Sequence, residues 1–214
     1  MSLSESLSGR LLPALPEPGK RFFDLVVLTL FVPLVLPLML TIVVVLLLAG
    51  GRPFYAQTRI GRGGTPFRMW KFRSMVPDAD AALARLCAAD PALAAEWGRN
   101  QKLRHDPRVT RLGRLLRRTS LDELPQLWNV ARGEMSLVGP RPFMADQEEL
   151  YRDAGGIGYF RLRPGLTGLW QVNGRGRTDF AARVQFDEAY ARTRSLVLDM
   201  RLILATATVL TSGR

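Results

Sequence analysis

Two adjacent carboxylates, Asp122 and Glu123, lie within the most basic part of the sequence. Arg117 precedes the pair, and Arg141 follows it within a Gly-Pro-Arg-Pro segment at 139–142. Arginine offers a planar fork that fits phosphate oxygens, and a carboxylate in such a setting can bind Mg²⁺ or attack phosphorus. We expect the positive field to lower the pKa of these carboxyl groups and keep them ionised. The pattern therefore indicates phosphate or metal chemistry.

A structural explanation of the same acids is also open. Ser120 and Glu123 have the spacing of a capping box, and acidic residues in a first turn favour the helix dipole. The predicted helix begins close to Pro125 and ends at Gly133. In this interpretation Ser120 and Glu123 form the cap, and only Asp122 is left without a structural role.

The overall charge points to an anionic partner. The chain has 214 residues and a formal net charge of +11, and most of its basic residues are arginines. Nucleic acid, lipid headgroups or a phosphorylated substrate would fit this charge, although a solvated arginine-rich surface would produce the same composition. Cys87 is the only cysteine and His105 the only histidine, which excludes an internal disulfide and argues against a zinc site.

One uncharged apolar run, Leu25 to Ala49, is longer than the roughly 20 residues that a helix needs to cross a bilayer. Pro33 and Pro37 lie near its middle, where each removes a helix hydrogen bond. Both flanks are basic, so the positive-inside rule places both ends on the cytoplasmic side. A single spanning helix is the alternative, but these features favour a re-entrant hairpin that enters and leaves by one face.

The chain is thus divided into three parts. We predict an N-terminal tail at 1–19, a re-entrant membrane helix at 20–50 and a cytoplasmic-face catalytic domain at 51–214. Within the last part, the pattern predicts these elements: a β-hairpin in 52–75, two helices in 77–103 with a break at Asp90-Pro91, a basic amphipathic helix at 111–118, a strand-like piece at 134–138, helix within 144–160, and two helices in 178–210. Helix 111–118 could lie on anionic lipid, contact nucleic acid or be solvated.

Other basic and polar residues are candidates for contacts with a phosphorylated substrate. Lys71 and Arg73 alternate with aromatic residues, which predicts either phosphate binding or a strand edge protected by charge. The glycine-rich segment 160–180 is predicted as a loop whose polar side chains could contact a base, a sugar or phosphate. Its candidate ligands are Arg163, Gln171, Asn173 and Arg175.

Four motifs occur in a fixed order: KFRSM, HDPRVTRLGRLLRRTSLDELPQLWNV, GEMSLVGPRP and RPGLTGLWQVNGR. In this combination they resemble the bacterial sugar transferase family, the small monotopic phosphoglycosyl transferases, over about residues 20–212. Within the family the sequence is most similar to the galactose-phosphate transferases that initiate exopolysaccharide repeat units. The resemblance implies transfer of a hexose-1-phosphate from a UDP-sugar to undecaprenyl phosphate, with release of UMP, at the cytoplasmic face of the bacterial inner membrane.

The resemblance also implies roles for individual residues. Asp122 would be the nucleophile that forms a covalent sugar-phosphoryl intermediate, with Mg²⁺ bound at Asp122 and with Glu123 assisting. Lys71, Arg117 and Arg141 correspond to the phosphate-binding residues of the family motifs. Pro37 corresponds to the break of the membrane helix, although Leu36 replaces the serine that is common before this proline.

We therefore expect an α+β, mainly helical protein with a re-entrant membrane helix hairpin, amphipathic interface helices and a small β-hairpin. Its expected partners are the UDP-sugar, undecaprenyl phosphate and membrane lipids, and a homodimer is left open. One alternative keeps these substrates but uses direct attack in a ternary complex, with Asp122 as a metal ligand only. The other alternative is a membrane-tethered nucleic-acid-binding protein. The acidic residues within the most basic region argue against it.

Overall fold

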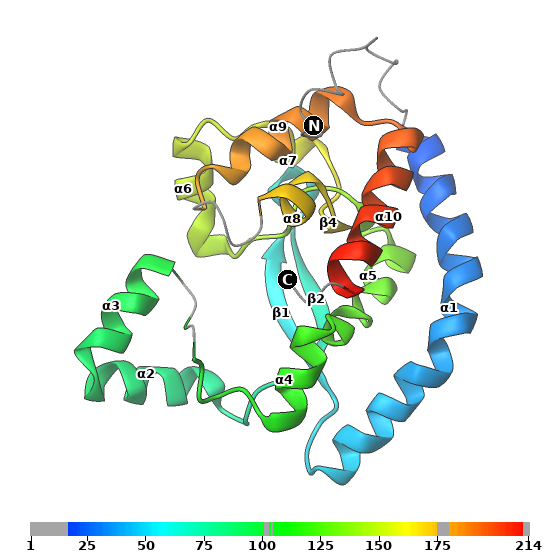
Figure 1. The fold of residues 1–214 in the computed structure, drawn as a ribbon. Coiled ribbons are helices and arrows are strands. Elements are labelled where there is room, and N and C mark those ends of the chain that lie inside the picture. Colours follow the sequence, from blue (N-terminus) through cyan, green and yellow to red (C-terminus); the bar gives the residue numbers. More distant parts are fainter. Residues whose placement is uncertain (1–16, 101–102, 104, 175–179, 212–214) are drawn as a thin grey trace.

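Two small β-sheets lie within a mainly helical body (Figure 1). The computed structural model describes residues 17–100, 103, 105–174 and 180–211. Strands β1 (Phe54–Ile60) and β2 (Pro66–Phe72) form an antiparallel hairpin, whereas β3 (Ser136–Val138) and β4 (Gly165–Thr167) pair in parallel. The α+β, mainly helical fold class is confirmed.

Helices surround the two sheets and supply most of the described residues. The α-helices are α1 (Glu17–Leu48), α2 (Ala79–Ala89), α3 (Pro91–Asn100), α4 (Arg111–Arg118), α5 (Gln126–Arg132), α6 (Glu148–Asp153), α7 (Gly158–Arg161), α8 (Leu169–Asn173), α9 (Arg183–Thr193) and α10 (Leu196–Thr211). Short 3₁₀ turns are η2 (Arg62–Gly64), η3 (Leu121–Glu123) and η4 (Ala145–Gln147). The predicted break at Asp90-Pro91 is confirmed, and the Asp90 carboxylate accepts a hydrogen bond from the Ala92 amide at 2.8 Å.

The prediction of a loop at 160–180 is wrong where this segment is described. It contains β4 and α8, and its glycines serve close packing rather than flexibility. A Cβ atom at Gly165 would lie 2.1 Å from the backbone nitrogen of Gly139, and one at Gly168 would lie 2.2 Å from the Gly139 oxygen. Only glycine allows this approach of the two chain segments.

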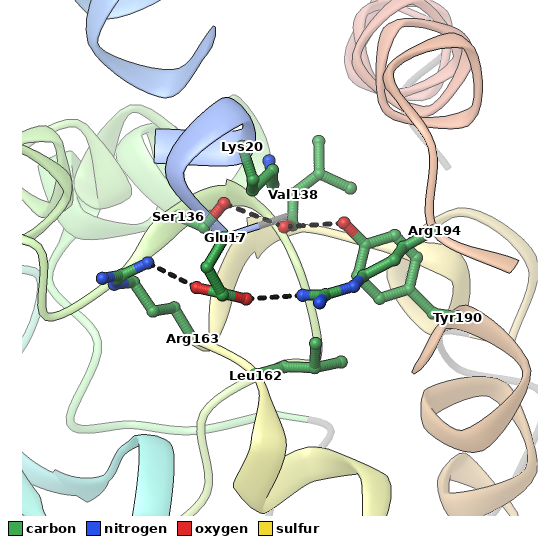
Figure 2. Close-up of a pocket in the computed structure, with 8 residues that line it drawn as sticks. All are labelled: Glu17, Lys20, Ser136, Val138, Leu162, Arg163, Tyr190 and Arg194. Atoms are coloured by element: carbon green, nitrogen blue, oxygen red, sulfur yellow. Dashed lines mark hydrogen bonds and ion pairs between the residues drawn. The ribbon is translucent and has the colours of Figure 1, made fainter. Parts of the chain in front are cut away.

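The first residue of α1, Glu17, is held by three arginines. Its carboxylate pairs with Arg163 at 2.7 Å and with Arg194, which lie on either side of it in a small pocket (Figure 2). The third partner is Arg62 of η2, at 3.1 Å. One carboxylate thus connects the N-terminal end of α1 to three separate parts of the chain.

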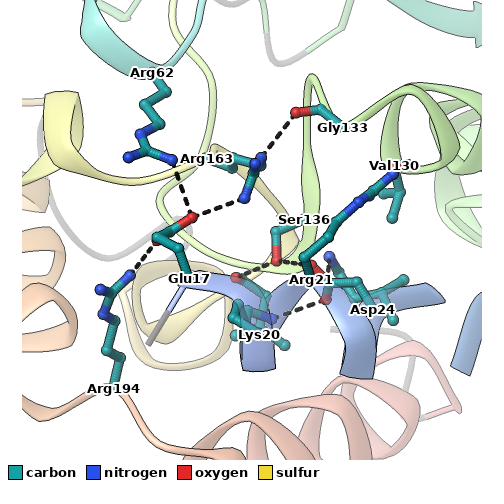
Figure 3. A network of polar contacts seen from close by, with 12 residues as sticks. Glu17, Lys20, Arg21, Asp24, Arg62, Val130, Gly133, Ser136, Arg163 and Arg194 are labelled. Carbon is teal, nitrogen blue, oxygen red and sulfur yellow. Dashed lines mark hydrogen bonds and ion pairs between the residues drawn. The ribbon is translucent and has the colours of Figure 1, made fainter. Parts of the chain in front are cut away.

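A buried polar network holds the next turn of α1 (Figure 3). Asp24 is fully buried and accepts hydrogen bonds from Ser136 Oγ at 2.7 Å and the Leu137 amide at 3.2 Å, both on β3. Lys20 lies between two acids, 2.9 Å from Asp24 and 2.8 Å from Asp199 of α10. Lys20 thus faces two carboxylates, and each carboxylate also accepts a hydrogen bond from elsewhere, which lets the network stay buried.

The C-terminal end of α1 contacts the same body. Ile42 and Leu46 pack with Phe72 of β2 and Leu116 of α4, and Arg73 donates a hydrogen bond to the Leu46 carbonyl at 3.3 Å. Between its two ends, α1 exposes many apolar side chains, which indicates association with a membrane.

Pro33 and Pro37 lie inside α1 and do not end it. The helix changes direction along its length (Figure 1), as expected where proline removes a backbone hydrogen bond. The structure therefore contains one bent helix at the expected position, and re-entrant insertion into a membrane stays a prediction.

Replacement of Asp24 tests the importance of the buried network. We expect Asp24→Ala to lower the free energy of unfolding by about 3 to 5 kcal/mol, because Lys20 and the Leu137 amide lose a buried partner. Chemical unfolding in detergent, followed by circular dichroism, measures this change. Thr29→Ala, at an exposed position of the same helix, should change stability by only about 0.5 kcal/mol. Equal effects of the two variants would contradict the prediction.

Candidate active site

The carboxylate pair lies on a tight turn between α4 and α5. Ser120 adopts a left-handed backbone conformation with φ of 54° and makes no side-chain cap hydrogen bond. Leu121–Glu123 form the 3₁₀ turn η3, and α5 begins only after Pro125. The capping-box interpretation is therefore wrong, because it requires a cap hydrogen bond to the Ser120 side chain.

Glu123 is held by two cations that come from distant parts of the sequence. Its Oε1 atom lies 2.9 Å from Lys71 Nζ on β2 and 3.3 Å from Arg141 in the Gly-Pro-Arg-Pro segment. Burial lowers the pKa of Lys71, and the charge of Glu123 acts in the opposite direction. The structure thus brings three of the predicted site residues into direct contact.

Asp122 lies beside this cluster and is only 7% exposed. Burial raises the pKa of its carboxyl group and outweighs the lowering effect of Lys71 and Arg117, while the charge of Glu123 also raises it. The expectation of a lowered pKa is therefore wrong for Asp122. A carboxylate that is poorly solvated is a better base and nucleophile than an exposed one, so this environment suits covalent chemistry.

Arg117 and Arg73 lie close to the site and have different contacts. Arg117 Nε donates to Ser74 Oγ at 2.9 Å, and its charge lowers the pKa of Asp122. Arg73 contacts the end of α1 through the Leu46 carbonyl. Arg117 therefore contributes to the field at the carboxylates, whereas Arg73 connects β2 to the membrane helix.

The remaining predicted ligands are not joined to the carboxylates by any contact that the structure describes. Arg163 pairs with Glu17 and donates to the Gly133 carbonyl at 2.9 Å, so it helps to anchor α1. Gln171 is buried on α8, and the Asn173 amide donates to the Leu169 carbonyl of its own helix at 3.0 Å. Arg175 lies outside the described residues. Substrate contacts of these four residues stay predictions.

A layer behind Arg141 was not predicted. Arg183 of α9 donates to the Arg141 carbonyl and lies over the rings of four aromatic residues. Its charge partner is Asp187, whose other contact is a 2.9 Å hydrogen bond from the Tyr151 hydroxyl. Burial lowers the pKa of Arg59 on β1, and the nearby charges of Arg141 and Arg183 lower it further. The sequence signal was a basic residue inside an otherwise buried helix face, which is unusual without a partner.

An apolar helix exposed beside an acid and arginine cluster defines a membrane-associated protein with a site suited to phosphate groups. Residues 16–213 match the family described as bacterial sugar transferase, and the chain belongs to this family.

Three relatives illustrate the similarity. The chain is 47% identical to a UDP-galactose-lipid carrier transferase of Erwinia amylovora, over 87% of this chain and 39% of the relative. It is 45% identical to an undecaprenyl-phosphate galactose phosphotransferase of Salmonella typhimurium, over 89% and 40% of the two chains. Identity to the exopolysaccharide production protein ExoY of Sinorhizobium fredii is 45%, over 88% and 83%. The chain therefore spans about two fifths of the first two relatives and most of the third.

The Asp187 carboxyl group should make stability depend on pH. Burial raises its pKa to about 6, against 3.8 in an exposed setting. Between these values the folded protein binds a proton that the unfolded chain has released, so the free energy of unfolding should fall as the pH rises from about 4 to about 6. The expected loss is about 2 to 3 kcal/mol, from 1.36 kcal/mol per unit.

Asp187→Asn provides the matched comparison, since asparagine can accept the hydrogen bond from Tyr151 but does not titrate. Denaturant unfolding of both proteins across this pH range measures the difference. A variant whose stability declines as steeply as that of the parent chain would show that Asp187 is not the group responsible.

Proposed function

We propose that this chain transfers a hexose-1-phosphate, with galactose-1-phosphate as the first candidate, from a UDP-sugar to undecaprenyl phosphate. The observation that carries the proposal is the buried Asp122 beside a Glu123 carboxylate that Lys71 and Arg141 hold in place. Membership of the bacterial sugar transferase family supports it, as do the names of two relatives, which refer to galactose. Such a transfer would be the first membrane step of exopolysaccharide synthesis.

In the first step, a carboxylate oxygen of Asp122 attacks the phosphorus that carries the sugar. The bond from this phosphorus to the bridging oxygen breaks, and UMP leaves with the electron pair. The product is a sugar-phosphoryl ester of Asp122. Burial of Asp122 favours this step, because little solvation has to be removed from the attacking oxygen.

In the second step, a phosphate oxygen of undecaprenyl phosphate attacks the same phosphorus and releases the Asp122 carboxylate. The products are undecaprenyl diphosphate sugar and the free enzyme. Because the two anionic substrates react in turn, they never have to be held against each other in one site. Lys71 and Arg141 supply positive charge near the transferred group, and Glu123 fixes their positions.

The site residues fit a magnesium ion that is bound partly by the substrate. Among the described residues, no group of three or more His, Cys, Asp or Glu side chains could hold a metal. Mg²⁺ is commonly bound by one or two carboxylates together with phosphate oxygens, and Asp122 and Glu123 are the two carboxylates available here. When bound, the ion would neutralise charge on the diphosphate of the donor.

We further infer that α1 enters the inner membrane from the cytoplasmic face and returns to the same face. Both ends of α1 contact one body, through Asp24 at one end and Leu46 at the other. A straight crossing would separate these ends by the thickness of the membrane. Such an arrangement would bring the carboxylates near the lipid headgroups, where the phosphate of a lipid acceptor would be available.

Trapping of the intermediate tests the reaction. The chain is incubated without acceptor with UDP-galactose or UDP-glucose that carries radioactive phosphorus next to the sugar. We expect label on the protein and release of UMP, faster with UDP-galactose. Asp122→Asn should abolish the label and lower turnover by about a thousandfold or more, whereas Asp146→Asn, at an exposed acid, should leave both unchanged.

The rival functions give different results in the same assay. Release of UMP only after addition of undecaprenyl phosphate, with no labelled protein, would favour direct attack in a ternary complex. No UMP release from any UDP-sugar, together with salt-sensitive DNA binding, would favour a nucleic-acid-binding protein.

Cysteine labelling tests the membrane arrangement. In a Cys87→Ser background, Pro18→Cys and Pro53→Cys place single thiols before and after the apolar part of α1. In sealed vesicles of known orientation, we expect a membrane-impermeant maleimide to label both positions from the cytoplasmic side. Labelling of the two positions from opposite sides would replace the re-entrant arrangement with a spanning helix.

A further inference from the structure

The end of strand β1 runs beside the segment that follows Arg141. The Ile60 backbone amide donates to the Phe143 carbonyl at 2.9 Å, and the Gln57 side-chain Nε2 donates to the sulfur of Met144 at 3.4 Å. The Tyr159 hydroxyl donates to the Ile60 carbonyl, which fixes the same residue by a second contact. These contacts hold Arg59, the residue before Ile60, next to the Arg141 segment.

Arg59 has an unusual charge environment. Its side chain donates a hydrogen bond to the neutral Gln57 amide oxygen at 2.6 Å, and its Nε atom is buried without a partner. No carboxylate among the described residues forms an ion pair with it. Burial, together with the charges of Arg141 and Arg183, lowers the pKa of Arg59 to about 10.

In the part of the chain that the structure describes, only two acids form ion pairs with these three arginines. Glu123 pairs with Arg141, and Asp187 pairs with Arg183, which leaves the charge of Arg59 uncompensated. The Arg59 side chain is partly buried, and burying a cation without an opposite charge is costly. A bound anion would compensate this charge. The Arg183 guanidinium is enclosed by aromatic rings and contacts the Arg141 carbonyl, so it supports the Arg141 main chain rather than facing a ligand.

We propose that Arg59 and Arg141 form a binding subsite for a phosphate monoester beside the carboxylate pair, with Arg183 as a positioning residue behind Arg141. This inference rests on the proposed function. Arg141 belongs both to this subsite and to the cluster around the carboxylate pair, because its side chain also contacts Glu123. A phosphate bound between Arg59 and Arg141 would therefore lie next to the reacting carboxylates.

The chemistry of the two steps explains why one subsite would serve twice. Displacement at phosphorus places the attacking and leaving oxygens roughly in line. With Asp122 on one side, UMP leaves from the opposite side, and the acceptor must attack from that same side to release Asp122. UMP and undecaprenyl phosphate are both phosphate monoesters, and each occupies this position in its own half of the reaction.

Arg59→Gln tests the subsite, with Arg68→Gln as the matched control. Arg68 lies on the paired strand, is exposed and carries the same charge. We expect Arg59→Gln to weaken UMP binding in calorimetry and to raise the KM for undecaprenyl phosphate, each by about 10- to 100-fold. Binding of uridine, which has no phosphate, should not change. Arg59→Lys keeps the charge but not the planar fork, and should restore part of both losses.

A thermal unfolding measurement separates the subsite from a purely structural role. Because Arg59→Gln removes a partly buried charge that has no ion pair among the described residues, we expect its Tm to equal or exceed that of the parent chain. A lowered Tm with UMP affinity and KM no more altered than in Arg68→Gln would overturn the proposal. If Arg59→Gln does not fold, the same measurements are made on Arg59→Lys. A loss of UMP affinity is then expected, and an unchanged UMP affinity would contradict the subsite.

The UMP-binding measurement and the KM for undecaprenyl phosphate also show which of the two phosphate monoesters uses the subsite. A loss confined to UMP, or confined to the acceptor, would overturn the shared use of the subsite. The proposed function is tested separately, since UMP release by the parent chain does not involve the variants. Conversely, calorimetry with UMP and uridine reports on the subsite even if no UDP-sugar is turned over.

Discussion

The buried contact between Asp24 and β3 is the interaction on which the arrangement of the site depends. Asp24 fixes Ser136 and the Leu137 amide, and the chain then continues through one short strand into the Gly-Pro-Arg-Pro segment. Arg141 in this segment contacts Glu123. The membrane helix therefore does more than retain the protein at a surface, because its polar first turns set the position of a cation that holds the candidate catalytic glutamate.

Opposing electrostatic effects define the site. Burial disfavours ionised Asp122, and the nearby cations favour it, with burial the larger effect. Glu123 differs from Asp122, because two cations, Lys71 and Arg141, contact its carboxylate directly. The adjacent acids therefore differ in environment, which is how one pair of carboxylates can supply both a nucleophile and a fixed partner for cations. The positive charge of the site also lowers the electrostatic cost of bringing an anionic phosphate to the carboxylate of the buried Asp122.

The sequence predicted those parts of the site that local patterns encode. The motifs identified Lys71, Glu123 and Arg141, and hydrophobic periodicity with turn residues located the β-hairpin and most helices. The capping-box interpretation failed because Ser120 adopts a left-handed conformation, which spacing alone does not reveal. The contact of Arg183 with the Arg141 carbonyl joins residues 42 positions apart, and no periodic signal indicates such a pairing.

The glycine-rich segment shows why composition misled the prediction of local structure. Gly139, Gly165 and Gly168 are in near contact through their backbones, so the parallel pairing of β3 with β4 requires the absence of side chains there. Hydrogen bonds from the Gly139 amide to the Thr167 carbonyl and from the Gly165 amide to the Pro140 carbonyl extend this contact up to the residue before Arg141. Since Asp24 holds β3 from one side and β4 holds it from the other, the segment with Arg141 starts from a rigid strand. A cation on such a support loses little conformational entropy when a phosphate binds, and the proposed two-step transfer would gain from this in both of its steps.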